Sequence, residues 1–231
     1  MKDKEISRRH ILKTSLAGLA GVLAISAKSA SQALAACSPT PAQMEGPYYP
    51  ESDLNRDSDL TQIEEGGPKA EGQVIYLTGK VSNSECQPLK ALVEIWQAAA
   101  SGKYNHSEDP NPLKLDPHFQ YWGRVQTASD GSFLFKTIIP GHYPIGGGKF
   151  RPPHIHFKVH AKHHVSLTTQ SYFDPKSYDD LELSRLVDRL NRAEGVDRRL
   201  MVLFENAGAG FEEGAKLGRF DITLHKMQNL E

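Results

Sequence analysis

The chain has 231 residues and a formal net charge of −1, with 27 Lys and Arg against 28 Asp and Glu. Residues 1–35 carry a charge of +4, so residues 36–231 carry −5. A mildly acidic body lacks the basic surface that nucleic-acid binding needs, and its length suits one well-buried domain better than two.

The first 35 residues have the features of an export signal. Ser7-Arg8-Arg9-His10 is a twin-arginine pattern, and it precedes an apolar stretch at 14–27 and an Ala33-Leu34-Ala35 cleavage site. The apolar stretch is shorter than the roughly 20 residues that a membrane span needs. We therefore expect residues 1–35 to be a signal peptide for the twin-arginine export machinery, and the mature protein to be periplasmic or secreted.

The only two cysteines, Cys37 and Cys86, both follow this predicted signal peptide. In an oxidising compartment pairing is the default, and a disulfide across so long a loop could contribute on the order of 4 kcal/mol. A second interpretation competes, because residues 34–37 also resemble a lipobox, in which Cys37 is lipidated and anchors the protein. Both interpretations stay open at this point.

Residues 36–72 are rich in Pro, Gly, Asp and Glu, which indicates an N-terminal arm. From residue 73 onward, short β-rich runs alternate with turns, including an Asp130-Gly131 hairpin signal. The expected strands are 74–81, 91–97, 122–127, 132–137, 154–160, 167–173, 200–205 and 220–224. Apolar residues with helical spacing predict one helix at 179–191, ending before Gly195. This order predicts an all-β domain at 73–231, an antiparallel β-sandwich with long loops around the active site and one short helix.

A long polar loop at 103–121 contains His106 and His118. A loop of this length in a compact domain is commonly functional, so these histidines either line a pocket or lie on its surface. Residues 146–148 are all Gly and are interpreted as a flexible loop, since no phosphate-binding pattern follows them. A further group of histidines is interpreted as a surface cluster rather than a second metal site: His160, His163 and His164.

The most informative stretch is Arg151-Pro152-Pro153-His154-Ile155-His156-Phe157. Side chains alternate along a strand, so His154 and His156 point to one face, roughly 7 Å apart, where both imidazoles can close on one metal ion. Tyr143, in the turn just upstream, could add an oxygen ligand. Two imidazoles and a tyrosine oxygen, with no Cys or obvious carboxylate nearby, suit Fe(III) better than Zn(II). On its own, a His-x-His pattern on a strand more often places both histidines in solvent than on a metal ion.

An ordered set of blocks makes the body similar to the intradiol ring-cleavage dioxygenases, non-haem Fe(III) enzymes that open catechols between their two hydroxyl groups. The resemblance is strongest to the protocatechuate 3,4-dioxygenase type and its single-domain secreted relatives, and it runs from Thr40 to about Phe173. Any one block would be weakly specific, whereas the set is highly specific. The blocks are 40–43, 45–49, 93–98, 102–104, 123–127, 130–133, 140–144, 151–157 and 170–173.

This resemblance implies one Fe(III) per chain with four protein ligands: Tyr104, Tyr143, His154 and His156. It implies that the partners are O2 and a small aromatic diol, protocatechuate or catechol-like, and that the product is a cis,cis-muconate. It also implies a catalytic group of Tyr143, Gln170 near the iron pocket, and Arg151, which would stabilise charge on the substrate. Tyr48 and Tyr49 correspond to a segment at the substrate mouth. Assembly into a homo-oligomer is left open.

Two alternatives belong to other classes of protein. A non-catalytic, prealbumin-like β-sandwich binding module would share the strands but lack the four ligands, so iron content and colour would distinguish it. A cupin metalloenzyme would show a third His and a carboxylate in two spaced motifs, which we do not find. Within the family, catechol 1,2-dioxygenases and hydroxyquinol dioxygenases carry an extra N-terminal helical segment. Residues 36–72 are too short and too rich in Pro and Gly to form it.

Overall fold

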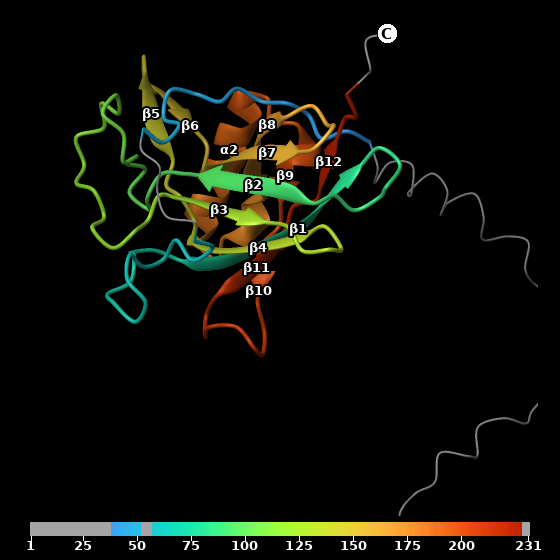
Figure 1. Ribbon diagram of the computed structural model, residues 1–231. Coiled ribbons are helices and arrows are strands. Elements are labelled where there is room, and N and C mark those ends of the chain that lie inside the picture. Colours follow the sequence, from blue (N-terminus) through green and yellow to red (C-terminus); the bar gives the residue numbers. More distant parts are fainter. Residues whose placement is uncertain (1–37, 52–56, 228–231) are drawn as a thin grey trace, which may run out of the picture. The chain divides into compact units, whose positions relative to one another are not determined.

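The computed structural model describes residues 38–51 and 57–227 (Figure 1). The predicted signal peptide and Cys37 lie outside these residues, so neither the export signal nor the fate of Cys37 is described. Within them, two five-stranded sheets are accompanied by a two-stranded hairpin, one α-helix and two short 3₁₀ helices, Pro175–Ser177 and Arg198–Leu200. No helix in the described ranges is long and apolar enough to cross a membrane.

The first sheet has the order β10-β11-β1-β12, and β4 also pairs with β1. Its strands are β1 (Val74–Asn83), β4 (Ser132–Ile138), β10 (Glu205–Asn206), β11 (Lys216–Arg219) and β12 (Ile222–Leu224). β11 and β12 pair in parallel with successive parts of β1, whereas β4 is antiparallel to it. Between β11 and β12, the Phe220 carbonyl passes so close to Gly79 that a Cβ there would collide with it, so β1 needs glycine at this position.

The second sheet has the order β3-β2-β7-β8-β9. Its strands are β2 (Ala91–Trp96), β3 (Trp122–Gln126), β7 (His154–Ala161), β8 (Leu167–Phe173) and β9 (Met201–Val202). Its pairs are antiparallel except for β8 and β9. The latter pair is parallel because a long crossover containing the helix joins the two strands. The predicted β-sandwich with one helix is confirmed, and its sheets are mixed because three strand pairs run in parallel.

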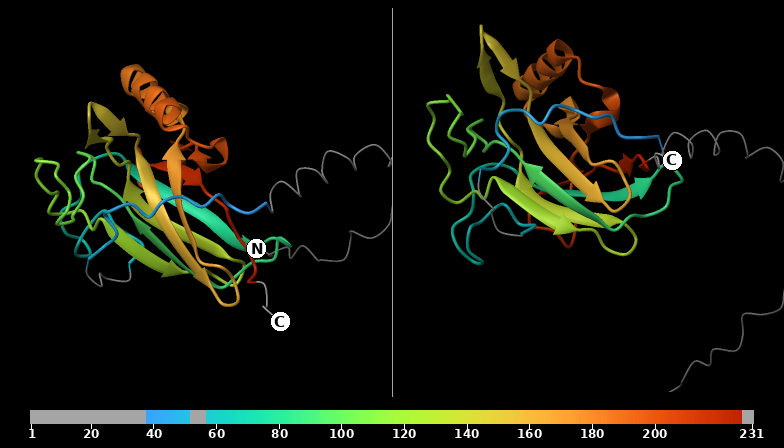
Figure 2. Two further views of the ribbon diagram at one scale, coloured as in Figure 1. Left: turned by 90° about the horizontal axis from the view of Figure 1, so that it is seen from above. Right: turned by 45° about the horizontal axis from the view of Figure 1, so that its top comes forward.

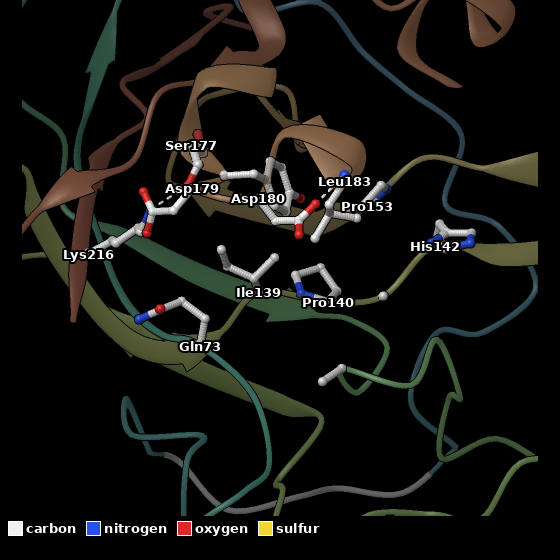
Figure 3. A pocket seen from close by; sticks show the side chains of 13 residues that line it. Gln73, Ile139, Pro140, His142, Pro153, Ser177, Asp179, Asp180, Leu183 and Lys216 are labelled. Carbon is white, nitrogen blue, oxygen red and sulfur yellow. Dashed lines mark hydrogen bonds and ion pairs between the residues drawn. The ribbon is translucent and has the colours of Figure 1, made fainter. Parts of the chain in front are cut away.

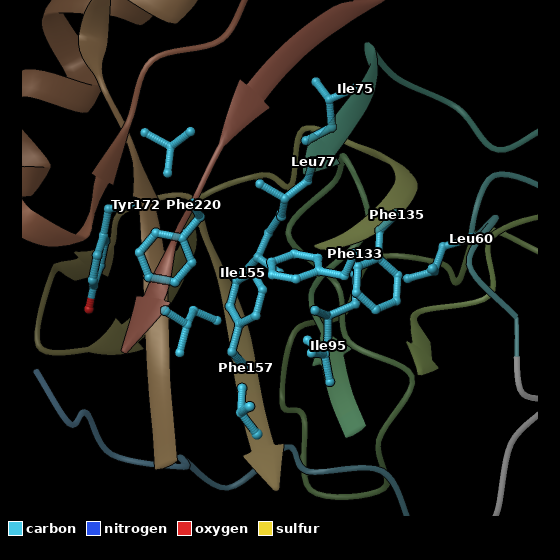
Figure 4. Close-up of a cluster of buried hydrophobic side chains, with 14 of the residues drawn as sticks. Leu60, Ile75, Leu77, Ile95, Phe133, Phe135, Ile155, Phe157, Tyr172 and Phe220 are labelled. Carbon is cyan, nitrogen blue, oxygen red and sulfur yellow. The ribbon is translucent and has the colours of Figure 1, made fainter. Parts of the chain in front are cut away.

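The core lies between the two sheets (Figure 4). Burial alternates along β1, so Ile75 and Leu77 face the core. From the other sheet, Ile155 and Phe157 of β7 enter the same core. The two histidines of β7 alternate with these residues and therefore point to the opposite face of the second sheet.

The helix α2 (Leu181–Glu194) forms part of the crossover after β8. It begins after Asp180, whose carboxylate accepts a hydrogen bond from the Leu183 backbone N–H at 2.7 Å. It ends at Gly195, which has a left-handed conformation with φ of 71°. The helix predicted at 179–191 is confirmed, with its end three residues later than expected. α2 lies beside the hairpin β5–β6 at one end of the sandwich (Figure 2).

Three strands were not predicted: β5 (Tyr143–Gly146), β6 (Lys149–Arg151) and β11. β5 and β6 form a hairpin, and the three glycines at 146–148, which were interpreted as a flexible loop, form its turn with positive φ angles. The strands β5 and β6 are short and largely exposed, so they show no alternation of apolar and polar residues. The single strand expected at 200–205 is divided between β9 and β10, which belong to different sheets.

The arm crosses both sheets through backbone hydrogen bonds. In residues 38–51, the Gln43 N–H donates to the Thr168 carbonyl of β8 at 2.9 Å. In residues 57–72, the Leu60 N–H donates to the Lys136 carbonyl of β4 at 2.8 Å, and the Leu60 side chain is fully buried. The first of these segments passes over the outer face of the second sheet (blue in Figure 1). It therefore helps to cover the two histidines of β7.

Candidate metal centre

His154 and His156 lie at the start of β7, and each is 2% exposed. Both rings point the same way, and their Nε2 atoms are 3.1 Å apart. His156 lies opposite Trp96 of β2, whose indole stacks on the imidazole with 4.7 Å between ring centroids and 8° between planes. On the β8 side, His156 lies opposite Gln170 and His154 lies opposite Tyr172. The sheet register therefore fixes the direction of both imidazoles.

The two imidazoles have the protonation state of metal ligands. His154 Nδ1 lies 2.7 Å from the Pro152 carbonyl oxygen, so Nδ1 is the donor and the Nε2 lone pair is free. Burial lowers the pKa of His154 to about 3, and it lowers the pKa of His156 well below the ordinary range, so both rings are neutral at pH 7. Two nitrogens that bind one metal at about 2.1 Å and a right angle lie about 3 Å apart. The observed Nε2 separation fits that arrangement.

Tyr104 and Tyr143 face these imidazoles from two other segments. They are 3% and 6% exposed, and their ring centroids are 5.4 Å apart at an interplanar angle of 89°. The Tyr143 ring lies 5.7 Å from the His154 ring, and the Tyr104 ring lies 6.4 Å from the His156 ring. The structure thus brings all four predicted ligands into one buried cluster.

Glycine makes this meeting of loops possible. Gly102, just before Tyr104, has φ of 82°, and a Cβ there would collide with the His142 carbonyl oxygen. Gly141, which directly precedes His142, donates its N–H to the Ala99 carbonyl at 2.9 Å. The turn that precedes Tyr104 can therefore pack directly against the turn that precedes Tyr143.

The surroundings of the two phenols fit a bound metal ion. Burial raises the pKa of Tyr104 well above its usual value and that of Tyr143 to about 12. Tyr104 Oη is buried and makes no hydrogen bond of good geometry with any described residue. A cation beside these oxygens would give Oη a partner and favour the phenolate form. Two neutral nitrogen donors and two oxygen donors therefore fit a metal ion, and the oxygens suit a hard, oxidised one.

Arg151, at the end of β6, lies beside this cluster. Its Nη2 donates to Gln170 Oε1 at 2.7 Å and to Tyr172 Oη at 3.2 Å. Tyr172 Oη in turn donates to Gln170 Oε1 at 2.8 Å, while Gln170 Nε2 donates to the Met44 carbonyl of the arm at 2.8 Å. Gln170 is therefore locked in place and orients the guanidinium group.

The arm residues Tyr48 and Tyr49 differ in their surroundings. The Tyr48 ring centroid lies 4.7 Å from that of Tyr104. The ring of His106, from the long loop, lies 5.7 Å from the Tyr48 ring, also between centroids. Tyr49 instead donates its hydroxyl to Glu94 at 3.2 Å and packs edge-on against the Trp96 indole. Tyr48 therefore covers the predicted ligands, whereas Tyr49 supports the tryptophan that stacks on His156.

Two cavities lie near the cluster. The smaller, of about 120 Å³, is bounded by Tyr48, Trp96 and Tyr104. The larger, of about 420 Å³, lies between the start of α2 and the turn at 140–142 (Figure 3). Lys216 in its wall already donates to the Ser177 carbonyl at 2.6 Å, and none of the four clustered side chains lines it. The chemistry therefore belongs to the cluster and not to the larger cavity.

The other histidines named above lie apart from the cluster. His118 is half-buried in the long loop, His163 is exposed, and His160 Nδ1 lies 2.7 Å from Ser166 Oγ. His164 is buried rather than on the surface, with Nδ1 2.8 Å from the Lys162 carbonyl. Across residues 38–51 and 57–227, no three His, Cys, Asp or Glu side chains form a group that could hold a metal ion.

Three residues near the cluster had no role assigned from the sequence: Trp96, Tyr172 and Glu194. Tyr172 lies two residues beyond Gln170 on a predicted strand, so strand periodicity alone could have placed the two side chains on one face. Placing Trp96 beside His156 requires knowledge that β2 pairs with β7, which the sequence does not show. Glu194 lies on α2, far along the chain, yet its Oε1 is 3.3 Å from Arg151 Nε.

The chain is similar to known dioxygenases over most of its length. The family described as "Dioxygenase" matches residues 44–225. The protocatechuate 3,4-dioxygenase beta chain of Burkholderia cepacia is 38% identical over 194 residues, which cover 77% of this chain and 76% of that one. A chlorocatechol 1,2-dioxygenase of Cupriavidus pinatubonensis (strain JMP 134 / LMG 1197) is 31% identical over 151 residues, covering 58% of this chain and 54% of the relative.

Solved structures share the fold. The dioxygenase domain of a dioxygenase carbohydrate-binding protein fusion from Streptomyces sp. SirexAA-E has a TM-score of 0.59 and 30% identity. That similarity covers 82% of this chain and 99% of the domain. The 3-chlorocatechol 1,2-dioxygenase of Rhodococcus opacus 1CP has a TM-score of 0.61 at 22% identity, over 86% of this chain and 78% of that one, and it supports the fold alone.

Proposed function

This chain belongs to the intradiol ring-cleavage dioxygenases, and we propose that it binds one Fe(III) and uses O2 to cleave a catechol-type diol to a cis,cis-muconate. Protocatechuate and catechol-like diols are the proposed substrates. The observation that carries the proposal is the convergence of two neutral imidazoles and two phenols in one buried cluster. A non-catalytic binding module has no need of such a set.

The four clustered side chains would hold the iron: Tyr104, Tyr143, His154 and His156. When bound, Fe(III) would supply a Lewis acid that holds both diol oxygens and withdraws electron density from the aromatic ring. The Pro152 carbonyl, by accepting from His154 Nδ1, keeps Nε2 directed into the cluster. The Trp96 indole prevents rotation of the His156 ring by stacking on it.

The remaining side chains would act on the substrate. We propose that Tyr143 Oη, in the phenolate form that a bound metal ion would favour, accepts a proton from a substrate hydroxyl. Arg151 stays charged at any working pH and would stabilise the negative charge that develops on the diol ring. Gln170 holds the guanidinium through Nη2, and the Tyr48 ring would shield the reacting atoms from bulk water.

Oxygen uptake by iron-loaded protein, measured over a panel of diols, tests this function. We expect catechol or protocatechuate to be consumed with one O2 per diol and a ring-opened muconate to form. His156→Ala is the matched control, and it should show neither iron nor uptake because three ligands leave an open, weakened site. Absence of uptake with every diol, in parent protein that contains one iron per chain, would contradict the proposed activity.

We also propose that the protein acts outside the cytoplasm. The support is the twin-arginine pattern at Arg8 and Arg9, together with the apolar stretch and the cleavage site that follow. Replacing both arginines with Lys should retain the protein inside the cell while leaving its fold unchanged. Cell fractionation would measure this, and unchanged export of the double variant would contradict the proposed route.

A further inference from the structure

Glu194, the last residue of α2, forms an ion pair with the arginine beside the metal cluster. Its Oε1 lies 3.3 Å from Arg151 Nε, and the arginine side chain is only 11% exposed. We propose that Glu194 is a positioning residue, which fixes the Arg151 guanidinium group for the reaction without touching the substrate itself. The inference rests on the function proposed above for Arg151.

The contacts of the guanidinium group leave one nitrogen available. Nη2 donates to Gln170 Oε1 and Tyr172 Oη, while Nε faces Glu194. Nη1 makes no hydrogen bond or ion pair with any residue in the described part of the chain. Because the group is planar, contacts at Nε and Nη2 fix its orientation. They leave Nη1 to meet charge on a ligand.

The position of Glu194 in its helix supports a specific role. A carboxylate at the C-terminal end of a helix faces the negative end of the helix dipole, which is unfavourable unless a cation compensates. The neighbouring basic residue of this turn, Arg192, already pairs with Asp188 at 3.0 Å. Arg151 therefore provides the cation for Glu194.

The end of the helix is also anchored to the strand that contributes the other contacts. Asn191 is 5% exposed, and its Nδ2 donates to the Phe173 carbonyl at the end of β8 at 3.0 Å. Gly195 closes the helix, with its N–H near the carbonyls of Arg192 and Asn191. Since β8 also carries Gln170 and Tyr172, the groups that hold Arg151 come from β8 and the helix end fixed to it.

Three variants separate positioning from a general effect on the helix. Glu194→Ala removes the side chain that faces Nε, whereas Glu194→Gln removes only its charge and keeps a polar side chain of the same length beside Nε. Asp188→Ala is the matched control, because it breaks an exposed ion pair on the same helix. For each variant we would measure kcat and KM of the iron-loaded enzyme, its iron content and its melting temperature. The rate at which phenylglyoxal labels Arg151 in iron-free protein would be followed by peptide mass spectrometry.

We expect Glu194→Ala to lower kcat by about tenfold, because the guanidinium group loses the side chain that fixes it at Nε, while iron content and KM stay near the parent values. Arg151 should be labelled several-fold faster in this variant, because Nε is released. Glu194→Gln should restore most of the turnover and slow labelling. Asp188→Ala should match the parent in turnover and in the labelling rate of Arg151.

Two results would overturn the proposal. One is a Glu194→Ala variant with parent turnover and parent labelling. The other is equal loss of turnover in all three variants in step with a lower melting temperature, which would indicate a purely structural role. If the parent enzyme cleaves no diol, the proposed function fails separately, while labelling of the iron-free protein still tests whether Glu194 restrains Arg151.

Discussion

Tyr104 Oη and His156 Nδ1 are both buried, and neither makes a hydrogen bond of good geometry with a described residue. Each unsatisfied polar atom of this kind destabilises a folded chain by about 1–3 kcal/mol. Both residues lie in the cluster where the four predicted ligands meet. A metal bound to Tyr104 would remove one of these two penalties, so metal binding should stabilise the folded protein.

Arg151→Lys tests the role of a single guanidinium group. We expect this variant to keep its iron and its colour, because Arg151 is not among the four clustered side chains. Turnover should fall by roughly a hundredfold, since an ammonium group cannot reproduce the planar contacts to Gln170 and Tyr172. Steady-state kinetics of iron-loaded protein would measure this, and parent-like turnover would contradict the assigned role.

At the level of elements, the two loops that carry Tyr104 and Tyr143 depend on glycine. Gly102→Ala combines an unfavourable positive φ with a collision against the His142 carbonyl. We expect it to destabilise the fold by more than about 1 kcal/mol and to lower iron content, because the two tyrosines move apart. Thermal unfolding and metal analysis would measure both effects.

Gly148→Ala is the matched control for this change. Gly148 has a similar φ of 72°, but a Cβ there would have no neighbour within 4 Å. The Gly148→Ala variant should therefore lose only the stability that the positive φ costs an alanine, and its iron content should equal that of the parent. Equal behaviour of the two variants would show that the close approach of the loops is unimportant.

The sequence predicted elements well where packing imposes a period. β8 was expected at 167–173 and is observed there, and β7 begins as predicted at His154. The hairpin β5–β6 was missed because its short strands are mostly exposed, and β11 was missed because its buried positions are Lys216 and Gly218, which give no apolar pattern. Among the residues around the site, the clustered ligands followed from motifs. The contact between Glu194 and Arg151 could not be predicted, because it depends on how α2 packs against β6.

At the scale of the whole molecule, Glu212 connects distant segments. It lies 2.7 Å from Lys69 Nζ in the arm and 2.9 Å from Lys136 Nζ in β4. Hydrogen bonds from Lys136 and then Lys69 lower the pKa of Glu212 below its ordinary value. The pKa of Glu212 is lower in the folded than in the unfolded chain, where it is about 4.5. The ion pairs of Glu212 with Lys69 and Lys136 therefore stabilise the fold above about pH 4.5, and this contribution is lost as the pH falls through the folded-state pKa.

We therefore expect Glu212→Gln to lower the melting temperature at pH 7, with a cost of about 1 kcal/mol or less because the pair is partly exposed. The difference from the parent should shrink below about pH 4 as the parent carboxylate becomes protonated. Glu213→Gln, at the exposed neighbouring position, is the control. A difference that stays constant from pH 7 to pH 3 would contradict the electrostatic explanation.

The state of Cys37 remains a prediction, because this residue lies outside the described part of the chain. If it pairs with Cys86, the intact mass should be two hydrogens below the reduced value, and reduction should lower the melting temperature. Acyl chains on Cys37, in protein purified from its native envelope fraction, would instead establish the lipid anchor. Intact mass spectrometry before and after reduction distinguishes the two.

The central claim is that two tyrosines and two histidines form one Fe(III) site. Metal analysis of purified protein, after expression with ample iron and zinc, tests this claim most directly. The account predicts one iron per chain in coloured protein, since phenolate oxygens favour an oxidised, hard metal. Colourless protein with one zinc per chain and no iron would contradict it.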